Sequence, residues 1–193
     1  MKYCQEQSRI YDLGCSLGGA TLAAVDRVEC QDFSTIAIDN SAAMIDRLQI
    51  KLRNLPRFAS KIECRCEDLC GSEIANASVV ILNFTLQFIP LAERVPLLRK
   101  IYAGMKPGGV LIISEKITFP DEKLNQLFIE MYHSFKENRG YSKLEISQKR
   151  AALEKVLLPE TLDANRDRLQ KIGFQSVDVW FQCFNFASMV AFK

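Results

Sequence analysis

The segment Tyr11-Asp-Leu-Gly-Cys-Ser-Leu-Gly-Gly19 decides the fold. It overlaps the end of an apolar run at residues 9–13, which predicts a strand, and leads into residues 20–28, which have helical spacing. Glycines at the end of a strand let the backbone turn tightly and approach a ligand closely. We interpret the segment as the first strand-to-helix turn of an α/β domain and as a candidate binding loop.

The rest of the chain continues this alternation. Amphipathic runs predict helices at 44–52, 91–105, 123–137, 142–156 and 163–171, and apolar runs predict strands at 34–39, 61–66, 78–83, 110–114, 176–183 and 186–192. The turn between the last two strands is too short for a parallel crossover. We therefore expect a doubly wound α/β fold, with a seven-stranded, mostly parallel sheet and a C-terminal antiparallel strand pair. Residues 1–193 form one predicted domain, with a helical insertion at about 121–172.

Composition excludes several classes of protein. Of the 193 residues, 48% are hydrophobic, which is typical of a globular chain rather than a disordered one. The formal net charge is only +2, without a run of five like charges, so direct binding to nucleic acid is not expected. No apolar stretch is long enough to span a membrane, and the first ten residues lack the apolar core of a signal peptide. We expect a cytoplasmic protein without a membrane partner.

The seven cysteines favour reduced thiols over a disulfide framework, because their number is odd and they are scattered. Cys64, Cys66 and Cys70 form the only cluster, and His133, the single histidine, is distant from it in the sequence. A zinc site would need a fourth ligand. No metal is expected.

Polar residues stand at the ends of three further predicted strands. A carboxylate at Asp39 can accept hydrogen bonds from both hydroxyls of a ribose, or it can help to cap the following helix, whose predicted N-cap is Asn40 or Ser41. Asp68 follows the third strand, where it can face a ligand or lie in solvent. Asn83 ends an apolar strand, where an amide is costly unless it meets a ligand or bonds locally.

The segment Asp12-Leu-Gly-Cys-Ser-Leu-Gly18 resembles the first motif of class I S-adenosylmethionine (SAM) methyltransferases, D/E-x-G-x-G-x-G, with Ser16 in place of a glycine. A closer resemblance, to the carboxy-SAM synthase family, runs from about residue 10 to the end of the chain. It rests on that segment and on four others: Ile38-Asp-Asn-Ser41, Leu82-Asn-Phe-Thr-Leu-Gln-Phe88, Leu144-Glu-Ile-Ser-Gln-Lys-Arg150 and Trp180-Phe-Gln-Cys-Phe-Asn-Phe186.

The resemblance implies an enzyme that converts SAM and prephenate into carboxy-SAM and phenylpyruvate. A partner tRNA carboxymethyltransferase would then use carboxy-SAM to modify the wobble uridine of tRNA. The resemblance also implies a homodimer. It places these residues around the cofactor: Gly14, Cys15 and Ser16 at its turn, Asp39 and Asn40 at the ribose, Asp68 and Leu69 at the adenine, and Asn83 near the sulfonium.

Arg150 is the residue that the resemblance assigns to the new carboxylate. Ser142 and Glu145 form an S-x-x-E capping box, which predicts a helix that presents Arg150 at a fixed angle. A planar guanidinium grips a carboxylate through two parallel hydrogen bonds. The alternative is an arginine on the helix surface, paired with Glu145 or Glu154.

The sequence leaves the proton acceptor open among four candidates: His133, Tyr132, Tyr141 and Glu115. It also departs from the family at its start, because only residues 1–8 precede the first strand, where the family has a helical lid. We expect either a truncated chain or a different gene start, and in both cases the loss of the lid. We expect that loss to weaken cofactor binding and the exclusion of water.

Two rival functions remain open at this point: an ordinary methyltransferase of a small acceptor, and a SAM-binding protein without catalysis. The aromatic end at 180–186 fits either a subunit interface or two strands covered on both faces.

Overall fold

A computed structural model describes residues 2–154 and 156–193, without the side chains of residues 149, 150 and 154. Eight strands form one sheet in these residues: β1 (Ser8–Leu13), β2 (Phe33–Asp39), β3 (Ile62–Cys66), β4 (Ala77–Asn83), β5 (Met105–Thr118), β6 (Glu160–Thr161), β7 (Gln175–Cys183) and β8 (Phe186–Phe192).

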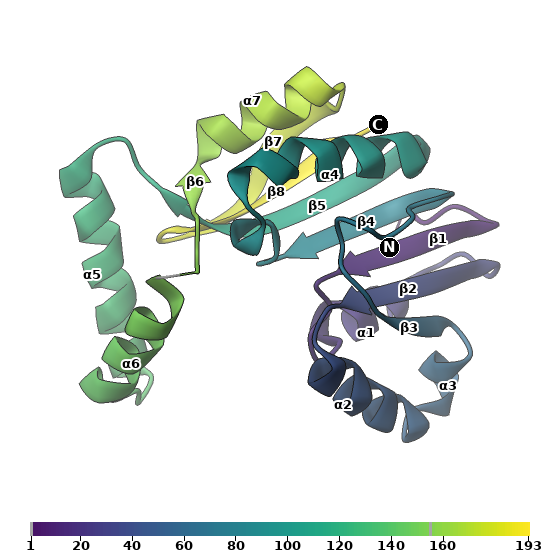
Figure 1. Cartoon of the computed structure of the whole chain (residues 1–193), viewed down its shortest axis with the longest axis horizontal. Coiled ribbons are helices and arrows are strands. Elements are labelled where there is room, and N and C mark those ends of the chain that lie inside the picture. Colours follow the sequence, from purple (N-terminus) through teal and green to yellow (C-terminus); the bar gives the residue numbers. More distant parts are fainter. Residues whose placement is uncertain (1, 155) are drawn as a thin grey trace.

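The sheet has the order β3-β2-β1-β4-β5-β8-β7 (Figure 1). The first five strands of this order are mutually parallel, whereas β8 pairs antiparallel with both β5 and β7. The predicted fold class is confirmed, including the antiparallel pair at the C-terminus. The two-residue β6 was not predicted. It pairs with the end of β5, off the main path of the sheet.

Helices cover both faces of the sheet (Figure 1). On one face, Leu97 and Leu98 of α4 and Leu169 of α7 belong to the same buried cluster as Tyr11 and Leu13 of β1. The helices α1 and α2 lie on the other face (Figure 1). The helices are α1 (Gly19–Val25), α2 (Ala42–Arg53), α3 (Pro56–Ala59), α4 (Leu91–Gly104), α5 (Glu122–Asn138), α6 (Lys143–Glu154), α7 (Leu162–Ile172) and the 3-10 turn η1 (Leu86–Phe88).

The strand β4 lies at the centre of the sheet, and every residue from Ala77 to Leu82 is buried. This agrees with an apolar strand that is covered on both faces. Only Asn83, at its carboxyl end, is exposed. The buried strand therefore delivers one polar residue to the edge where the parallel strands end.

The boundary between α4 and β5 differs from the prediction. The sequence Lys106-Pro-Gly-Gly was expected to separate the helix from a strand at 110–114, but β5 begins at Met105, directly after the helix. A Cβ atom on Gly109 would lie 3.1 Å from the backbone oxygen of Ser78. Glycine thus allows the neighbouring strand to come close, and the pairing with β4 shifts register in this region.

Between β5 and β7 the chain forms α5, α6, β6 and α7. The helices α5 and α6 stand apart from the sheet, beyond the carboxyl ends of the parallel strands (Figure 1). The predicted capping box of α6 is present: the backbone N–H of Glu145 donates to the Ser142 hydroxyl at 3.2 Å, and the Glu145 carboxylate accepts from the Ser142 backbone N–H at 2.8 Å.

Candidate functional site

A cavity of about 600 Å³ opens at the carboxyl ends of β1, β2, β3 and β4. This is the edge at which doubly wound sheets bind ligands. Its wall includes seven of the residues predicted from the sequence: Gly14, Ser16, Asp39, Asn40, Asp68, Leu69 and Asn83. Four separate segments are therefore brought to one cavity.

The turn after β1 requires glycine at its first position. Gly14 has φ +80°, and a Cβ atom there would lie 2.3 Å from the Thr85 hydroxyl oxygen. The backbone N–H groups of Gly14 and Cys15 both donate to the oxygen of Ile38, at 2.8 and 2.9 Å. The turn is thus fixed between β2 on one side and Thr85 on the other.

Ser16 stands where the methyltransferase motif has a glycine, and it keeps the backbone of a glycine. Its φ is +48°, in the left-handed region that disfavours residues with a Cβ atom. Its backbone N–H donates to Asp39 Oδ2 at 2.9 Å. The departure from the motif therefore changes the residue but not the shape of the turn.

Asp39 lines the cavity and also accepts hydrogen bonds from the backbone of two neighbouring segments. Its Oδ1 accepts from the backbone N–H of Ser41, the N-cap residue of α2, at 2.9 Å, and its Oδ2 accepts from Ser16. A carboxylate has about four acceptor positions, so two remain for ribose hydroxyls. Asp39 therefore joins the glycine turn to the helix while it still faces the cavity.

Asp68, in the loop after β3, and Asn83, at the end of β4, line the same cavity. Asp68 Oδ1 also accepts from the backbone N–H of Cys70 at 2.7 Å, so it orders its own loop. Asn83 is exposed at the strand end, next to Phe84, whose φ is +59°.

One predicted residue, Cys15, does not contribute its side chain to this cavity. Cys15 is buried in the core against Ile45 and Leu48 of α2, where burial raises the pKa of its thiol far above the ordinary range. Cys15 can therefore contact a cofactor only through its backbone atoms. Arg150 belongs to α6, and its side chain lies outside the described part of the structure.

Asp12, the acidic residue of the glycine-turn motif, lies beneath the turn. It is 1% exposed, and its Oδ2 accepts from the Thr21 hydroxyl at 2.5 Å. Burial raises its pKa to about 6, although the hydrogen bonds from Thr21 oppose that rise. Asp12 ties the start of α1 to β1.

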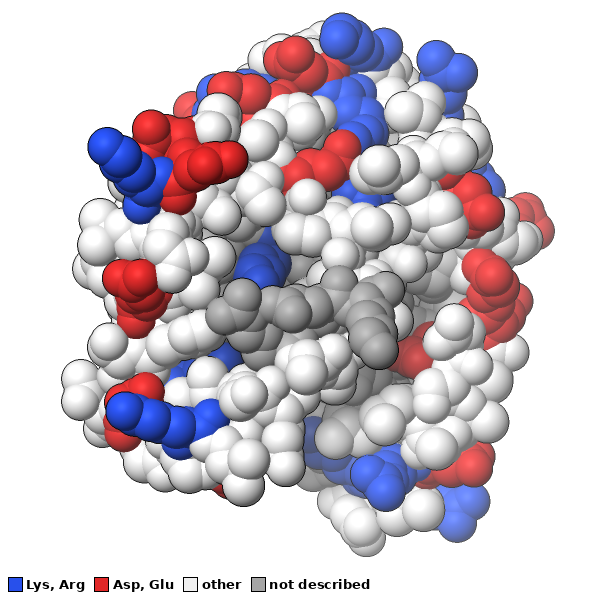
Figure 2. Space-filling view, turned by 60° about the vertical axis from the view of Figure 1, so that its left-hand side comes forward, with Lys and Arg blue, Asp and Glu red and all other residues white. Residues whose placement is uncertain are grey.

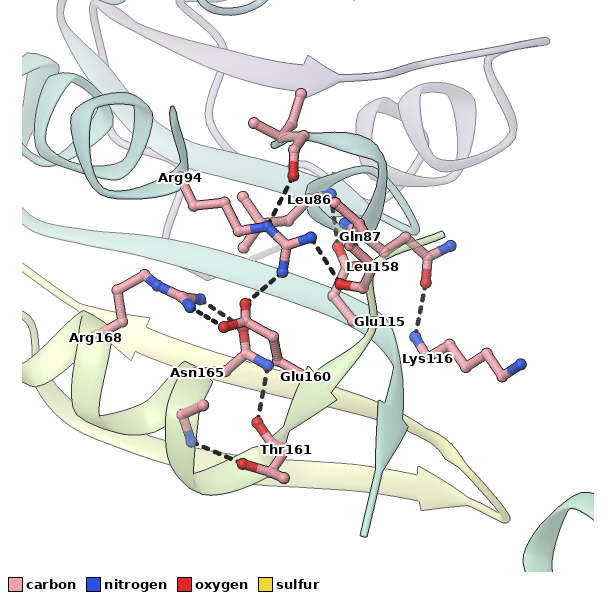
Figure 3. Close-up of polar contacts among 12 residues, drawn as sticks. Leu86, Gln87, Arg94, Glu115, Lys116, Leu158, Glu160, Thr161, Asn165 and Arg168 are labelled. Atoms are coloured by element: carbon pink, nitrogen blue, oxygen red, sulfur yellow. Dashed lines mark hydrogen bonds and ion pairs between the residues drawn. The ribbon is translucent and has the colours of Figure 1, made fainter. Parts of the chain in front are cut away.

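The segment after β4 is held by a residue that the sequence did not single out for this role. Glu115, near the end of β5, accepts from the backbone N–H groups of Leu86 at 2.8 Å and Gln87 at 3.0 Å (Figure 3). It also accepts from the backbone N–H of Thr85 at 3.2 Å. Burial raises its pKa to about 7, against these donors and the charge of Arg94. Both carboxylate oxygens are thus used for structure, which argues against Glu115 as the proton acceptor. The signal in the sequence that could have indicated this buried role is the position of Glu115, a charged residue that closely follows the apolar run 110–113.

A buried ion cluster lies next to this turn. Arg94 of α4 is 2% exposed; it pairs with Glu160 and donates to the Leu158 oxygen at 2.7 Å (Figure 3). Glu160 also pairs with Arg168 of α7. The cluster fixes the chain where it returns from the α5–α6 pair to the sheet.

A second cavity, of about 650 Å³, lies beside the first and shares Phe84 and Phe88 with it. Two of the four candidate proton acceptors, Tyr132 and His133, line this second cavity. Tyr141 is 55% exposed and lines neither cavity.

Figure 2 shows Lys and Arg side chains interspersed with Asp and Glu over the face that it draws. Among the described residues, no group of three or more His, Cys, Asp or Glu side chains is arranged to hold a metal ion. No helix in this part of the chain is both long and apolar enough to cross a bilayer.

The chain was compared with known protein families and with known proteins over its whole length. Residues 10–109 match the methyltransferase domain family. Carboxy-S-adenosyl-L-methionine synthases from Geobacter sp. (strain M21) and Aliivibrio fischeri (strain ATCC 700601 / ES114) are 53% and 50% identical over 192 residues. Each alignment covers 100% of this chain and 79% of the relative. The chain belongs to the carboxy-S-adenosyl-L-methionine synthase family. The resemblance seen in the sequence is thereby confirmed, and the family is one of enzymes.

Solved structures agree at the level of the fold. An O-methyltransferase family 2 protein from Planctomyces limnophilus matches with a TM-score of 0.69 at 16% identity, over 97% of this chain and 50% of that one. Human N-acetylserotonin methyltransferase in complex with SAM matches with a TM-score of 0.64 at 16% identity, over 96% of this chain and 47% of that one. The chain spans about half the length of these structures.

Proposed function

We propose that this chain makes carboxy-SAM and phenylpyruvate from SAM and prephenate. The observation that carries the proposal is identity of 50–55% over the full chain to relatives named for carboxy-SAM synthesis. We further propose that a tRNA carboxymethyltransferase consumes the product to modify the wobble uridine of tRNA. That partner would bind the tRNA, since the charge of this chain is nearly balanced.

The residues of the first cavity fit SAM. Gly14 leaves room that a side chain would fill, Asp39 keeps acceptor positions for ribose hydroxyls, and Asp68 and Leu69 lie on the side proposed for the adenine. Asn83 and Phe84 would lie at the sulfonium end, where the second cavity begins. SAM supplies a methyl group that the adjacent sulfonium makes acidic.

The contribution of the protein is mainly to position two reactants and exclude water. Holding two reactants in a productive geometry contributes about 7–11 kcal/mol to lowering a barrier in favourable cases. In the proposal, the second cavity holds prephenate next to the cofactor, and Arg150 of α6 binds the transferred carboxylate. Tyr132 and His133 remain the candidates for moving a proton, because both line the second cavity.

The proposed assembly is a homodimer in the cytoplasm. Trp180 and Phe181 lie on the edge strand β7 and are 63% and 62% exposed, which supports a subunit interface over two strands with both faces covered. Exposed neighbouring aromatic side chains are typical of interfaces. Light scattering of the purified protein tests the dimer, and a strict monomer contradicts it.

Mass spectrometry of the small molecule released from natively purified protein tests the function. We expect carboxy-SAM from the unchanged chain, and carboxy-SAM formation when SAM and prephenate are supplied. Arg150→Lys should lose the carboxylated ligand, because an ammonium group does not reproduce two parallel hydrogen bonds. Lys143→Ala, an exposed change in the same helix, should retain it.

Other outcomes would support the rival functions. Plain SAM that remains unchanged in the presence of prephenate would favour an ordinary methyltransferase of a small acceptor. Bound SAM without turnover of any acceptor would favour a SAM-binding protein without catalysis.

A further inference from the structure

Two cysteine side chains meet at the edge of the sheet opposite the cofactor cavity. Cys4 lies just before β1, and Cys30 lies in the loop between α1 and β2. Because β1 and β2 are parallel, with Ser8 paired to Phe33, both cysteines lie where these strands begin (Figure 1). The cofactor cavity opens where the same strands end. A chemical change at the two thiols therefore acts on the far edge of the sheet from that cavity.

The two sulfur atoms are in close contact. The Sγ atoms of Cys4 and Cys30 are 2.6 Å apart, although the residues are 26 positions apart in the sequence. Non-bonded carbon atoms, which are smaller than sulfur, make contact at about 3.5–4.0 Å. The separation is only about 0.6 Å longer than a disulfide bond. Both thiols are free in this structure, and little movement would be needed to join them.

Hydrogen bonds align the two backbone segments that carry the thiols. The Glu6 carboxylate accepts from the backbone N–H groups of Gln31 at 3.0 Å and Asp32 at 2.7 Å. The backbone N–H of Gln7 donates to the Asp32 oxygen at 2.6 Å. Cysteines can be bridged without strain only where their backbones already have the right separation. Three bonds next to the thiols fix that separation before any oxidation occurs.

The two thiols differ in their access to solvent. Cys4 is 9% exposed and belongs to a buried cluster with Ile10 and Val79, whereas Cys30 is partly exposed and packs against that cluster. Burial raises the pKa of the Cys30 thiol, and the adjoining Cys4 thiol and the Glu6 carboxylate add to the rise. The thiolate is the form that attacks a disulfide, so we expect slow oxidation. A thiol with a raised pKa is also a poor leaving group, so we expect slow reduction of the bond.

We propose that Cys4 and Cys30 form a reversible disulfide site, which a low-molecular-weight disulfide oxidises. Cys30, the accessible thiol, loses its proton and attacks the reagent, which gives a mixed disulfide and one reagent thiol. Cys4 then loses its proton and attacks the Cys30 sulfur, which releases the second reagent thiol. In total, two S–H bonds of the protein are replaced by one S–S bond, and the S–S bond of the reagent is reduced to two S–H bonds.

The bond would stabilise the fold and leave the cofactor cavity unchanged. It would tie the segment before β1 to the loop before β2 and close 26 positions of sequence into a ring. Such a link restricts the unfolded chain, so the melting temperature should rise by about 5–10 °C for a domain of this size. The Kd for SAM should stay within about twofold, because distant sites act independently.

Peptide mapping after treatment with glutathione disulfide tests the bond directly. After the remaining thiols have been alkylated, trypsin should release residues 3–9 joined to residues 28–47, and each of these peptides contains a single cysteine. The melting temperature should rise as stated, and dithiothreitol should reverse both changes. In Cys4→Ala, which lacks the second thiol, the reagent should remain on Cys30 as a glutathione adduct.

Two further variants provide the controls. Cys30→Ala should give neither the linked peptide nor the rise in melting temperature. Cys66→Ala removes an exposed thiol at the end of β3 and should give both. Each variant is compared with its own untreated sample, so a change in its starting stability does not affect the result.

Three outcomes would overturn the proposal. The first is the absence of the linked peptide although Cys66 in the same sample carries glutathione, which would show that the two thiols are only in contact. The second is an equal rise in melting temperature in Cys30→Ala. The third is a change in the Kd for SAM of tenfold or more on oxidation, which would show that the effect of the bond is not confined to stability. The inference does not rest on the proposed function, because the linked peptide and the melting temperature are measured without SAM or prephenate.

Discussion

Glu115 of β5 and Leu86 of η1 are joined by a 2.8 Å hydrogen bond across 29 residues of sequence, from the Leu86 backbone N–H to Glu115 Oε1. The same carboxylate takes the N–H groups of Thr85 and Gln87. One side chain thus holds three consecutive backbone donors of the segment that separates the two cavities. The positions of Phe84 and Phe88, which line both cavities, depend on this segment.

Replacement of Glu115 by alanine should loosen this wall. Three backbone N–H groups would lose their acceptor, which lowers the free energy of unfolding by about 2–4 kcal/mol. Because the segment lines both cavities, the Kd for SAM and the KM for prephenate, the proposed second substrate, should both rise about tenfold or more. Urea unfolding and calorimetry measure the two effects. Glu73→Ala, which removes an exposed carboxylate, should change neither.

Replacement of Gly14 by alanine should distort the turn after β1, which lines the cofactor cavity. The added Cβ would lie 2.3 Å from the Thr85 hydroxyl oxygen, at a φ of +80° that costs a residue with a side chain about 1–2 kcal/mol before any clash. We expect SAM binding at least tenfold weaker, measured by titration calorimetry. Adding Thr85→Ala should recover part of the binding, and no recovery would contradict a steric cause.

Ser16→Gly is expected to be neutral or stabilising. The residue already has φ +48°, so glycine removes the strain of a side chain in the left-handed region, against a cost of about 0.5–1 kcal/mol in unfolded-chain entropy. The backbone N–H that donates to Asp39 is retained. The melting temperature should stay within a few degrees or rise, with SAM affinity unchanged. A loss of affinity would show that the Ser16 hydroxyl itself contacts the cofactor.

The fold and most of the cofactor cavity could be predicted because their signals are local. A glycine turn, an apolar strand and a polar residue at the end of that strand are all visible within a few neighbouring residues, as at Gly14 and Asn83. The role of Glu115 was hidden, because it depends on residues 85–87, which lie in a segment distant in sequence. The burial of Cys15 was missed for the same reason, since the turn that carries it packs against α2.

Arg94→Met should destabilise the fold strongly. Removal of Arg94 leaves Glu160 with one of its two cationic partners and the Leu158 oxygen without its donor; breaking a buried pair in this way costs about 3–5 kcal/mol. Because these residues hold the return from α6 to the sheet, limited proteolysis should cut the α5–α6 region faster.

The exposed pair of Arg57 and Asp26, 2.9 Å apart, provides the control for that change. Arg57→Met should cost no more than about 1 kcal/mol, as is usual for surface pairs. The double change of Arg94 and Glu160 to methionine should be at least as harmful as Arg94→Met alone, because it also deprives Arg168 of its carboxylate partner. Equal losses from the buried and the exposed arginine would refute the structural role of the cluster.

Stability should fall as the pH rises from about 4.5 to 7, and Glu115 should be one cause. Burial raises the pKa of Glu115 from the ordinary 4.5 to about 7, so the folded chain binds a proton there that the unfolded chain has already lost. The folded state is then favoured below the unfolded pKa, and that advantage is lost as the pH passes through the folded pKa. Asp12, with a pKa raised to about 6, adds a second contribution between about pH 4 and 6.

The variant Glu115→Gln isolates the first of these contributions. Glutamine has nearly the shape of the protonated carboxyl group but does not titrate, so the difference in unfolding free energy between pH 5 and pH 8 should be smaller by about 2–3 kcal/mol than in the unchanged chain. Urea unfolding at the two pH values gives this difference directly. An identical pH dependence in both proteins would show that Glu115 is ionised throughout this range, held by its three backbone donors and the nearby charge of Arg94 rather than neutralised by burial.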